Sequence, residues 1–427
     1  MTASVLRKKI YVLDVNFGKD IGGAGKASKD IILGLTDIYD VIFIPKYAEI
    51  KNVRDAESRE EFSKFANLLL DQGISIPSLI MEYVMSKSDH LLSGFIQIIT
   101  AVVEQGAIVL DLNYFPYLEP LNLDDLVKEF FFRGEIYYLK KYNRCKVISL
   151  LQTLDNRPIK SNLDFAIKSS IKFHYFDLHF LFKSFYRDLK DEYVVSKFLK
   201  FSDMILLYSS GSLASLKVKK YDKEKFRILK VGNTIDKQLI VSDKEKYILY
   251  YARLIPEKGI FDILFVLGKI IQHCNVKLLI TGQFKNNDVK EAFLRMSEKY
   301  DLTKYISYLG YVSEHELDKL IKEAKVFLYP THYDSFPYSI MESIIRGTPV
   351  VTYAIPTVLS IYGQLKCVNV VEEFDFVKMA EKTLKLLRSD TNELKSMFEN
   401  ESVKDFIKRH EKKRVSTNEI ANYIMEV

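Results

Sequence analysis

The sequence is poor in cysteine, in long apolar runs and in net charge, and each shortage excludes a class of protein. Its 427 residues include three widely separated cysteines with no zinc-binding spacing. This sparse, odd set predicts no disulfide framework and favours a reducing, cytoplasmic compartment. No window of about 18 apolar residues is free of breakers, so no membrane-spanning helix is expected. The N-terminus leads into a predicted strand and lacks the apolar core of a signal peptide.

The charge balance argues against one class of partner. The net charge is only +6, and basic and acidic residues are interspersed. A dedicated nucleic-acid-binding protein would show a concentrated basic patch or a reading motif, and neither is present. We therefore expect no nucleic-acid partner. The length exceeds the size at which one hydrophobic core usually stops growing, so two domains are expected.

Short apolar runs alternate with helical periodicity along the chain, which predicts parallel sheets with helices on both faces. One series begins at Ile10–Asp14 and a second at Tyr247–Tyr251, after a polar linker around Asp236–Lys246. The prediction is an α/β protein of two Rossmann-like domains facing a cleft. They would comprise residues 1–240 and 241–427, and the last helix is a candidate to pack back on the N-terminal domain.

The most informative segment is Asp334–Glu342, Asp-Ser-Phe-Pro-Tyr-Ser-Ile-Met-Glu, followed by Ser-Ile-Ile-Arg-Gly-Thr-Pro-Val-Val. It predicts a loop, a helix and a buried strand, with Phe336 and Pro337 in the first helical turn and Gly347 as the stop. Two carboxylates are thereby fixed at the start of the helix and within it. A helix N-terminus attracts anions and a carboxylate accepts hydrogen bonds from sugar hydroxyls, so the segment suits a diphosphate and a sugar.

Other polar or glycine-ended turns follow the predicted strands of the same half. Arg253 and Lys258 occupy one loop, where a planar guanidinium and a compact ammonium suit adjacent phosphates. Two solvated loop cations are the alternative. Gly282 and Gly310 each end a strand, where a backbone can approach a ligand closely, although a plain turn explains each glycine equally well.

Together these segments resemble the retaining glycosyltransferases of family 4, the glycosyl transferases group 1, which have a GT-B fold. The resemblance implies that residues 1–240 form the acceptor side and residues 241–427 the nucleotide-sugar side. Asn233-Thr-Ile-Asp236 resembles the Asn-Gly-Val-Asp segment of the family. The other matching segments are the Arg253–Lys258 loop, Leu-Ile-Thr-Gly282, Leu-Gly310-Tyr-Val-Ser, Val-Phe-Leu-Tyr-Pro330-Thr and the acidic motif at 334–342.

The resemblance implies roles for the matching residues. Arg253 and Lys258 would be catalytic by binding the donor diphosphate and stabilising charge on the leaving nucleotide. Asp334, also implied as catalytic, stands where the family has a glutamate facing the donor sugar, and Glu342 would accept from the ribose. The implied donor-binding residues are Gly23, Gly282, Gly310, Tyr311, Phe336, Pro337, Tyr338, Ser339 and Glu342.

The implied reaction is transfer of a hexose from a UDP- or GDP-sugar to a hydroxyl of a glycan, lipid or protein, with retained anomeric configuration. A diphosphate leaving group needs charge stabilisation more than it needs a protein nucleophile. No DxD motif or His/Cys cluster occurs, so we expect a metal-independent mechanism without a cofactor, in polysaccharide biosynthesis. A non-catalytic GT-B subunit stays open because Asp334 is shorter than the glutamate of the family and because Leu154 stands where many relatives have a histidine. A different GT-B activity, such as an epimerase or phosphorylase, is a further alternative. Pro337 replaces the usual glycine, which bears on the identity of the donor.

The first half matches the family less well. Gly22–Gly25 stands where the family has a glycine-rich loop over the donor phosphates, and a structural tight turn is the alternative. A P-loop is excluded because Asp20 and Ala27 occupy its glycine and Ser/Thr positions.

On the acceptor side, Leu154 stands where many relatives have a histidine. Asp111, Asn113 and Asp155 are the remaining candidates there, and a capping or turn role explains each of them as well.

The segment from Arg157 to Lys200 interleaves aromatic and basic residues. One interpretation is an amphipathic surface that meets a lipid-linked acceptor at the inner face of the membrane. The other is a set of aromatics packed inward beneath a solvated basic face. The first interpretation would make the protein a peripheral membrane enzyme of the cytoplasm.

Overall fold

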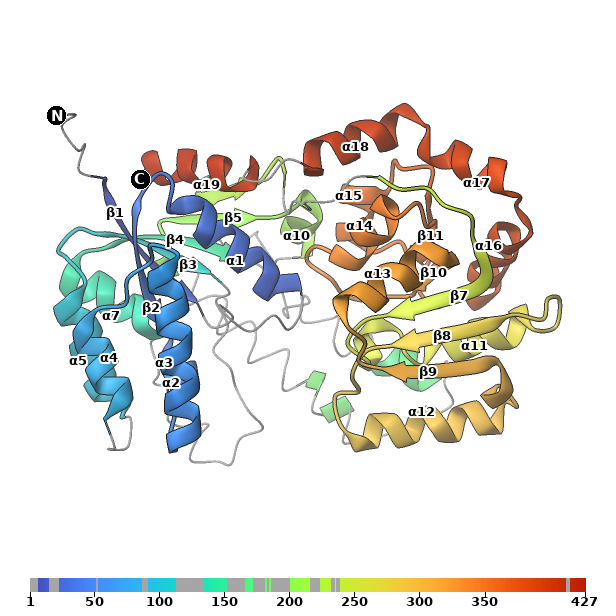
Figure 1. Ribbon diagram of the computed structural model, residues 1–427, viewed down its shortest axis with the longest axis horizontal. Helices are drawn as coiled ribbons and strands as arrows, with labels where there is room; N and C mark the ends of the chain where they lie inside the picture. Colours follow the sequence, from blue (N-terminus) through green and yellow to red (C-terminus); the bar gives the residue numbers. More distant parts are fainter. Residues whose placement is uncertain are drawn as a thin grey trace. The chain divides into compact units, whose positions relative to one another are not determined.

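The chain forms two compact units, each built on its own six-stranded parallel sheet (Figure 1). The computed structural model describes residues 7–14, 23–50, 53–86, 91–112, 134–151, 166–171, 181–182, 184–185, 200–215, 223–231, 235, 239–411 and 415–427. The first unit is Met1–Tyr208, Ser215–Gly232 and Arg414–Val427, and the second is Ser209–Ala214 and Asn233–Lys413. The predicted α/β class with two parallel sheets is therefore confirmed.

The first sheet has the strand order β2-β1-β3-β4-β5-β6. Its strands are short runs rich in Val, Ile and Leu whose inner residues are buried, as expected for a parallel sheet covered on both faces. The strands are β1 (Lys9–Asp14), β2 (Asp40–Pro45), β3 (Ile108–Leu112), β4 (Lys146–Leu151), β5 (Met204–Leu207) and β6 (Phe226–Ile228).

Helices connect these strands and differ from the prediction at one point. Helix α1 begins at Gly23, so Gly23–Gly25 lies in the first turn of a helix, whereas the sequence predicted a loop or tight turn at Gly22–Gly25. The helices of this part of the chain are α1 (Gly23–Leu35), α2 (Tyr47–Ile50), α3 (Ala56–Asp71), α4 (Ser78–Met85), α5 (Leu92–Val102), α7 (Gly134–Asn143) and α10 (Ser210–Ser215).

The last helix, α19 (Val415–Met425), packs against α1 within the first unit (Figure 1). Thr417 fills the space beside Gly34, where an added Cβ would lie 2.5 Å from the threonine hydroxyl. Tyr39 donates from its hydroxyl to the Ala421 carbonyl over 3.3 Å. The chain thus returns to the first unit after the second is complete. The assignment of the two domains to an acceptor and a donor side stays a prediction.

The second sheet has the order β12-β11-β10-β7-β8-β9. Its strands are β7 (Glu245–Tyr251), β8 (Lys277–Thr281), β9 (Ile306–Gly310), β10 (Ala324–Tyr329), β11 (Val350–Tyr353) and β12 (Val368–Val371). Its helices are α11 (Asp262–Ile270), α12 (Asn287–Lys299), α13 (Glu314–Glu323), α14 (Tyr338–Ile345), α15 (Pro356–Tyr362), α16 (Phe376–Arg388), α17 (Thr391–Phe398) and α18 (Glu401–Glu411).

Local sequence fixes where several of these helices begin. Asn286, Ser313, Asp375 and Asp390 each accept a hydrogen bond from a backbone N–H in the first turn of α12, α13, α16 and α17, respectively. Such caps satisfy the otherwise unpaired donors of a helix start.

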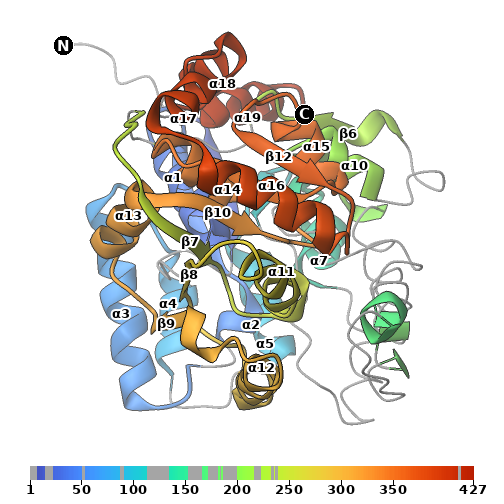
Figure 2. The ribbon, with the colours of Figure 1, turned by 90° about the vertical axis from the view of Figure 1, so that its right-hand side faces the viewer.

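The connections of the second sheet run outward from its centre. The chain goes from β7 to β8 and β9 in one direction, and from β10 to β11 and β12 in the other. Because parallel crossovers are right-handed, their helices cover opposite faces of the sheet. Accordingly α11 packs against α16, and α13 packs against α14 (Figure 2). The point of divergence lies between β7 and β10, where open α/β sheets bind their ligands beyond the carboxyl ends of the strands.

No helix within the described ranges is both long enough and apolar enough to cross a membrane.

Candidate functional site

Two loops meet at the point of divergence in the second unit. Strands β7 and β10 are parallel neighbours, with Ile248 opposite Val326 and Leu249 opposite Phe327. The loop after β7 carries Arg253 and Lys258, and the loop after β10 leads to Asp334. Residues distant in sequence are therefore brought together because their strands pair in register.

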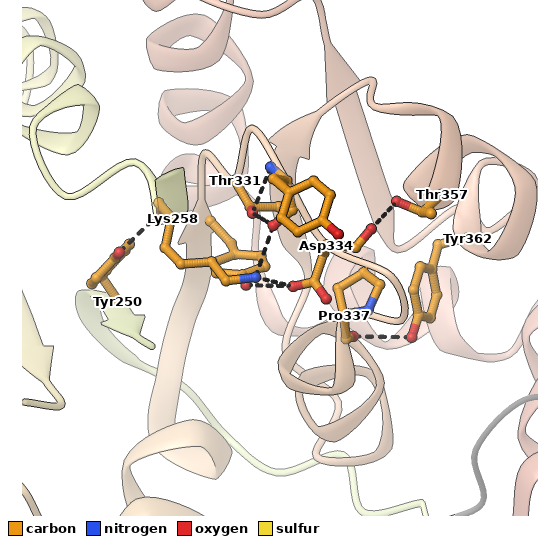
Figure 3. Close-up of polar contacts among 9 residues, drawn as sticks. Tyr250, Lys258, Thr331, Asp334, Pro337, Thr357 and Tyr362 are labelled. Atoms are coloured by element: carbon orange, nitrogen blue, oxygen red, sulfur yellow. Dashed lines mark hydrogen bonds and ion pairs between the residues drawn. The ribbon is translucent and has the colours of Figure 1, made fainter. Parts of the chain in front are cut away.

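Lys258 and Asp334 form the centre of this site. The Lys258 Nζ atom lies 2.6 Å from Asp334 Oδ2 and 2.8 Å from the Tyr333 carbonyl oxygen (Figure 3). The lysine and aspartate side chains are 11% and 15% exposed. The pair is largely desolvated but still open to water, so an incoming anion or hydroxyl has access to it.

The surrounding tyrosines and threonine hold this pair in place. Tyr329 donates to Asp334 Oδ2 over 2.8 Å, and Thr357 donates to the Asp334 carbonyl over 2.7 Å. Tyr250 donates to the Lys258 carbonyl over 3.0 Å (Figure 3). Burial, and after it the Asp334 carboxylate, raises the pKa of Tyr329, which keeps this phenol a hydrogen-bond donor. Within the described part of the chain, Asp334 Oδ1 receives no hydrogen bond and remains able to accept one.

The helix start beside Asp334 differs from the prediction by two residues. Helix α14 begins at Tyr338 with Pro337 as its cap, so Phe336 and Pro337 precede the helix instead of forming its first turn. The cap makes no side-chain hydrogen bond to the helix. Tyr362 donates to the Pro337 carbonyl over 3.0 Å, which fixes the chain on its way into α14. The first N–H groups of a helix lack partners within that helix, so this terminus can bind an anion.

Phe336 is buried, and its ring packs against Tyr362 and His410 at centroid distances of 6.1 and 6.4 Å. Its side chain therefore anchors the loop in the core, and only its backbone is placed to meet a ligand.

Glu342 lies on α14 beside the end of β7. The Tyr251 hydroxyl donates to the Ser339 carbonyl over 2.6 Å and lies 3.1 Å from Ser343 Oγ. Burial, and then the charge of Glu342, raises the pKa of Tyr251. The Glu342 carboxylate thus stands close to a buried phenol at the carboxyl edge of the sheet.

Arg253 does not join the Lys258–Asp334 pair. It is exposed in the loop after β7, and its side chain makes no hydrogen bond or ion pair within the described ranges. The structure therefore brings together two of the three predicted catalytic residues and leaves the guanidinium in solvent.

Two predicted glycines shape the neighbouring strand ends. Gly282 has a φ of 135°, and a Cβ there would lie 1.9 Å from the Ala252 carbonyl oxygen. Only glycine permits this approach of the β7 and β8 loops. Gly310 accepts hydrogen bonds at its carbonyl from Gly282 N and Thr281 Oγ1. Tyr311, next in sequence, is 76% exposed, so its ring is available as a flat apolar surface.

The comparison with protein families matches this same region. Residues 232–405 fit the family model for glycosyl transferases group 1. Residues 232–405 are a glycosyl transferases group 1 domain. The Lys258–Asp334 pair and the start of α14 lie within this group 1 domain.

Individual relatives of the chain also include glycosyltransferases. An uncharacterized glycosyltransferase of Methanocaldococcus jannaschii is 31% identical over 121 residues, 28% of this chain and 30% of the relative. The O-antigen chain mannosyltransferase B of Escherichia coli is 28% identical over 119 residues, 27% of this chain and 31% of the relative. The aligned parts thus span about a third of the length of these curated relatives.

Solved structures resemble the whole chain. HepE of Anabaena, crystallised with UDP and glucose, superposes with a TM-score of 0.63 at 13% identity, over 99% of this chain and 100% of HepE. At this identity the likeness shows the fold alone, which is GT-B. The predicted fold family is confirmed.

Outside the group 1 domain, the structure describes only part of the predicted site. Asn113 and Asp155 lie outside the described residues, as does the loop that precedes Gly23. Asp111, in β3, is fully buried and ion-paired with Lys46. The predicted acceptor and phosphate roles of these residues stay predictions.

The sequence interpretation missed a buried histidine in the group 1 domain. His332, two residues before Asp334, contacts Asp262 and Glu373. No spacing rule connects these three positions, because each comes from a different strand-to-helix connection. The one local sign was a histidine inside an otherwise apolar and hydroxylic strand end, Tyr329-Pro-Thr-His332.

Proposed function

We propose that this protein transfers a sugar from a nucleotide-sugar donor to a hydroxyl acceptor with retention of anomeric configuration. The observation that carries the proposal is the Lys258–Asp334 pair at the divergence of β7 and β10, beside the start of α14, inside a group 1 domain. A cation, a helix N-terminus and a carboxylate in one place suit a diphosphate joined to a sugar.

The proposed roles follow from this arrangement. Lys258 and the first N–H groups of α14 bind the diphosphate, and Arg253 approaches it from solvent. When a phosphate binds the Lys258 ammonium in place of Asp334, the Asp334 carboxylate still accepts the hydrogen bond from Tyr329. It can then also accept a hydrogen bond from a hydroxyl of the donor sugar. The leaving diphosphate develops negative charge during the reaction. A positive group stabilises this charge most strongly in a partly desolvated site.

The remaining donor contacts are proposed from the strand ends. Glu342 accepts from the ribose, and Gly310 with Tyr311 meets the base. The HepE complex with UDP supports a uridine nucleotide, and a guanosine nucleotide is the alternative. We propose a hexose as the transferred sugar and a metal-independent reaction.

The acceptor is proposed to be a glycan or a lipid-linked glycan of polysaccharide biosynthesis. The similarity to the O-antigen chain mannosyltransferase B of Escherichia coli supports this class. A peripheral position at the cytoplasmic face of the membrane would suit a lipid-linked acceptor.

A thermal-shift screen against UDP, GDP, ADP and their sugars tests the donor proposal, since a ligand that binds the native state raises its melting temperature. One nucleotide should raise it in the wild type and in Lys290→Ala, which removes an exposed cation from α12 in the same unit. Lys258→Ala should lose the shift. No shift with any nucleotide would contradict the proposal.

A second measurement separates an enzyme from a binding protein. The preferred donor is incubated with candidate acceptors or water, and the anomeric configuration of the product is read by proton NMR. Retained configuration is expected. Nucleotide binding without transfer or hydrolysis would favour a non-catalytic subunit, and an inverted product would contradict the retaining reaction.

A further inference from the structure

A buried histidine joins three connections of the second unit. The His332 ring, in the loop after β10, has no solvent-exposed surface. Its Nε2 lies 2.9 Å from Oδ1 of Asp262, the first residue of α11, and its Nδ1 lies 2.9 Å from Oε1 of Glu373, in the loop after β12. Asp262 is buried, whereas the Glu373 side chain is 40% exposed.

The geometry determines the charge of this ring. An ionised carboxylate only accepts hydrogen bonds, and a neutral imidazole has only one N–H to donate. Both contacts are satisfied together when His332 carries a proton on each nitrogen. Asp262 is the first residue of α11, and it also accepts a hydrogen bond from the Tyr353 hydroxyl over 2.7 Å.

The groups that face the ring come from each packed element. They are Asp262 from α11, Glu373 and the Phe374 ring from the loop after β12, and Tyr353 from β11. Burial by itself would lower the pKa of His332, but Asp262 and then Glu373 outweigh it, and the pKa is raised. This direction agrees with the charge that the two hydrogen bonds require.

The same histidine stands between the two halves of the donor site. It is two residues before Asp334, and Asp262 is four residues after Lys258. The His332 backbone N–H donates to the Glu257 carbonyl over 3.0 Å, one residue before Lys258. Gly259 presses against the Pro330 carbonyl oxygen, where a Cβ would lie only 2.1 Å away. Backbone and side-chain contacts therefore hold the Lys258 loop against the Asp334 loop.

We propose that protonated His332 is a positioning residue for the donor site, which ties the Asp334 loop to the Lys258 loop through Asp262 and to the loop after β12 through Glu373. The inference rests on the proposed function, because it assumes that the two loops bind a nucleotide diphosphate together. His332 itself touches no substrate. When the ring loses its second proton, one of the two carboxylate contacts is lost and the loops are held less firmly.

The dependence on pH has a defined direction. The folded protein holds the pKa of His332 above the ordinary value of 6.5. The stabilisation is therefore complete below pH 6.5 and is lost as the pH rises through the folded-state pKa. Nucleotide affinity should follow the same course and decline on the alkaline side.

Glu373→Gln is the decisive variant, because it removes one carboxylate at a half-exposed position outside the donor-binding residues. It should lower the pKa of His332 and move the alkaline decline in nucleotide affinity to lower pH by the same amount. Glu372→Gln is the matched control. It makes the same charge change one residue away, with no side-chain contact to His332 within the described residues, and should leave both properties unchanged.

The experiment follows the His332 ring by carbon-13 NMR and the affinity for UDP or GDP by calorimetry, in wild type and both variants from pH 5.5 to about 9. Coupled movement in Glu373→Gln alone supports the proposal. The proposal is overturned if the pKa of His332 shifts in Glu373→Gln while the pH dependence of nucleotide affinity does not. It is also overturned if both variants have equal effects. If the wild type binds neither nucleotide at any pH, the proposed function is contradicted. If the wild type binds a nucleotide with an affinity that does not change as His332 titrates, only this inference is overturned.

His332→Gln gives an independent check. If it folds, as judged by circular dichroism, its affinity at pH 6 should fall about tenfold and lose its alkaline decline. Wild-type affinity in the folded variant would overturn the proposal. If the variant does not fold, the Glu373→Gln result decides.

Discussion

Both sheets carry a lysine–aspartate ion pair near the carboxyl ends of their strands, but the two pairs differ in their access to solvent. Lys46 and Asp111 have side chains that are 6% and 0% exposed, whereas Lys258 and Asp334 are 11% and 15% exposed. Each lysine also donates to a backbone carbonyl next to its aspartate, Leu112 in one unit and Tyr333 in the other. The same chemistry thus serves a closed site in the first unit and an accessible one in the second.

The difference shows that an ion pair at a strand end is not enough to indicate a ligand site. Burial raises the pKa of Asp111 to about 6, so this carboxyl is held where ionisation is unfavourable and water does not reach it. Asp334 lies instead beside the start of α14, where the side chain of the cap residue Pro337 makes no hydrogen bond to the helix. We interpret the first pair as part of the core and the second as part of the donor site.

Lys46→Met should have the largest effect on stability. It leaves the Asp111 carboxylate buried without its counterion, which typically costs about 3–5 kcal/mol. Urea unfolding at pH 8 measures the loss. Lys64→Met, which breaks an exposed ion pair with Glu60 on α3, is the control and should leave the midpoint unchanged. Equal midpoints for the two variants would contradict a closed, structural role for Lys46.

Lys258→Ala should act mainly on the reaction. Loss of charge at the leaving diphosphate is expected to lower kcat/KM by about 10²–10³-fold. Its loss of stability should be smaller than that of Lys46→Met because solvent reaches its partner Asp334. Steady-state kinetics with the preferred donor, beside urea unfolding, give both quantities. Full activity of Lys258→Ala would contradict the distinction between a structural Lys46–Asp111 pair and a functional Lys258–Asp334 pair.

Asp111→Asn should alter the pH dependence of stability. The folded protein raises the pKa of Asp111 from 3.8 to about 6, so its favourable contribution is present below pH 3.8 and is lost as the pH rises through about 6. The variant lacks this titration. Between pH 4 and 7, the wild-type urea midpoint should therefore fall relative to that of the variant, and parallel curves would contradict the burial of this carboxyl.

Asp334→Glu should have the smallest effect. It restores the longer acid that the family has at this position, and it moves the carboxylate by one methylene relative to Tyr329 and Lys258. In a closed pocket, one methylene changes kcat/KM by about 10–200-fold. Because this site is open to solvent, we expect kcat/KM to change by about tenfold or less. The preference between donor sugars should also change. Competition between two donor sugars measures this preference. Complete loss would show that the aspartate is required for activity itself.

Much of the second unit was predictable from local sequence. The runs Tyr247–Tyr251 and 326–329 are apolar and bounded by polar turns, and both form strands, with the proposed site residues in the loops after them. The structure of the Asp334–Glu342 segment was predictable because its helix, its glycine stop and the following strand are local signals. Its helix start was placed too early, since Pro337 serves as the cap and Phe336 turns into the core.

Contacts between separate connections were not predictable. Nothing in the spacing of Asp262, His332 and Glu373 indicates that they meet, because strand pairing and helix packing determine it. The same holds for the Lys46–Asp111 pair, which follows from the order β2-β1-β3 in the first sheet. A single sequence identifies elements and their ends, but it does not identify the neighbours that those ends acquire.

Hydrogen exchange with and without a bound nucleoside diphosphate tests the central claim most directly. Binding of UDP or GDP should protect the amides of residues 252–259 and 338–342 in the second unit. The amides of Lys46 and of Asp111 in β3 should be unaffected by the diphosphate. Protection around Lys46 and Asp111 without protection at 338–342 would contradict the account.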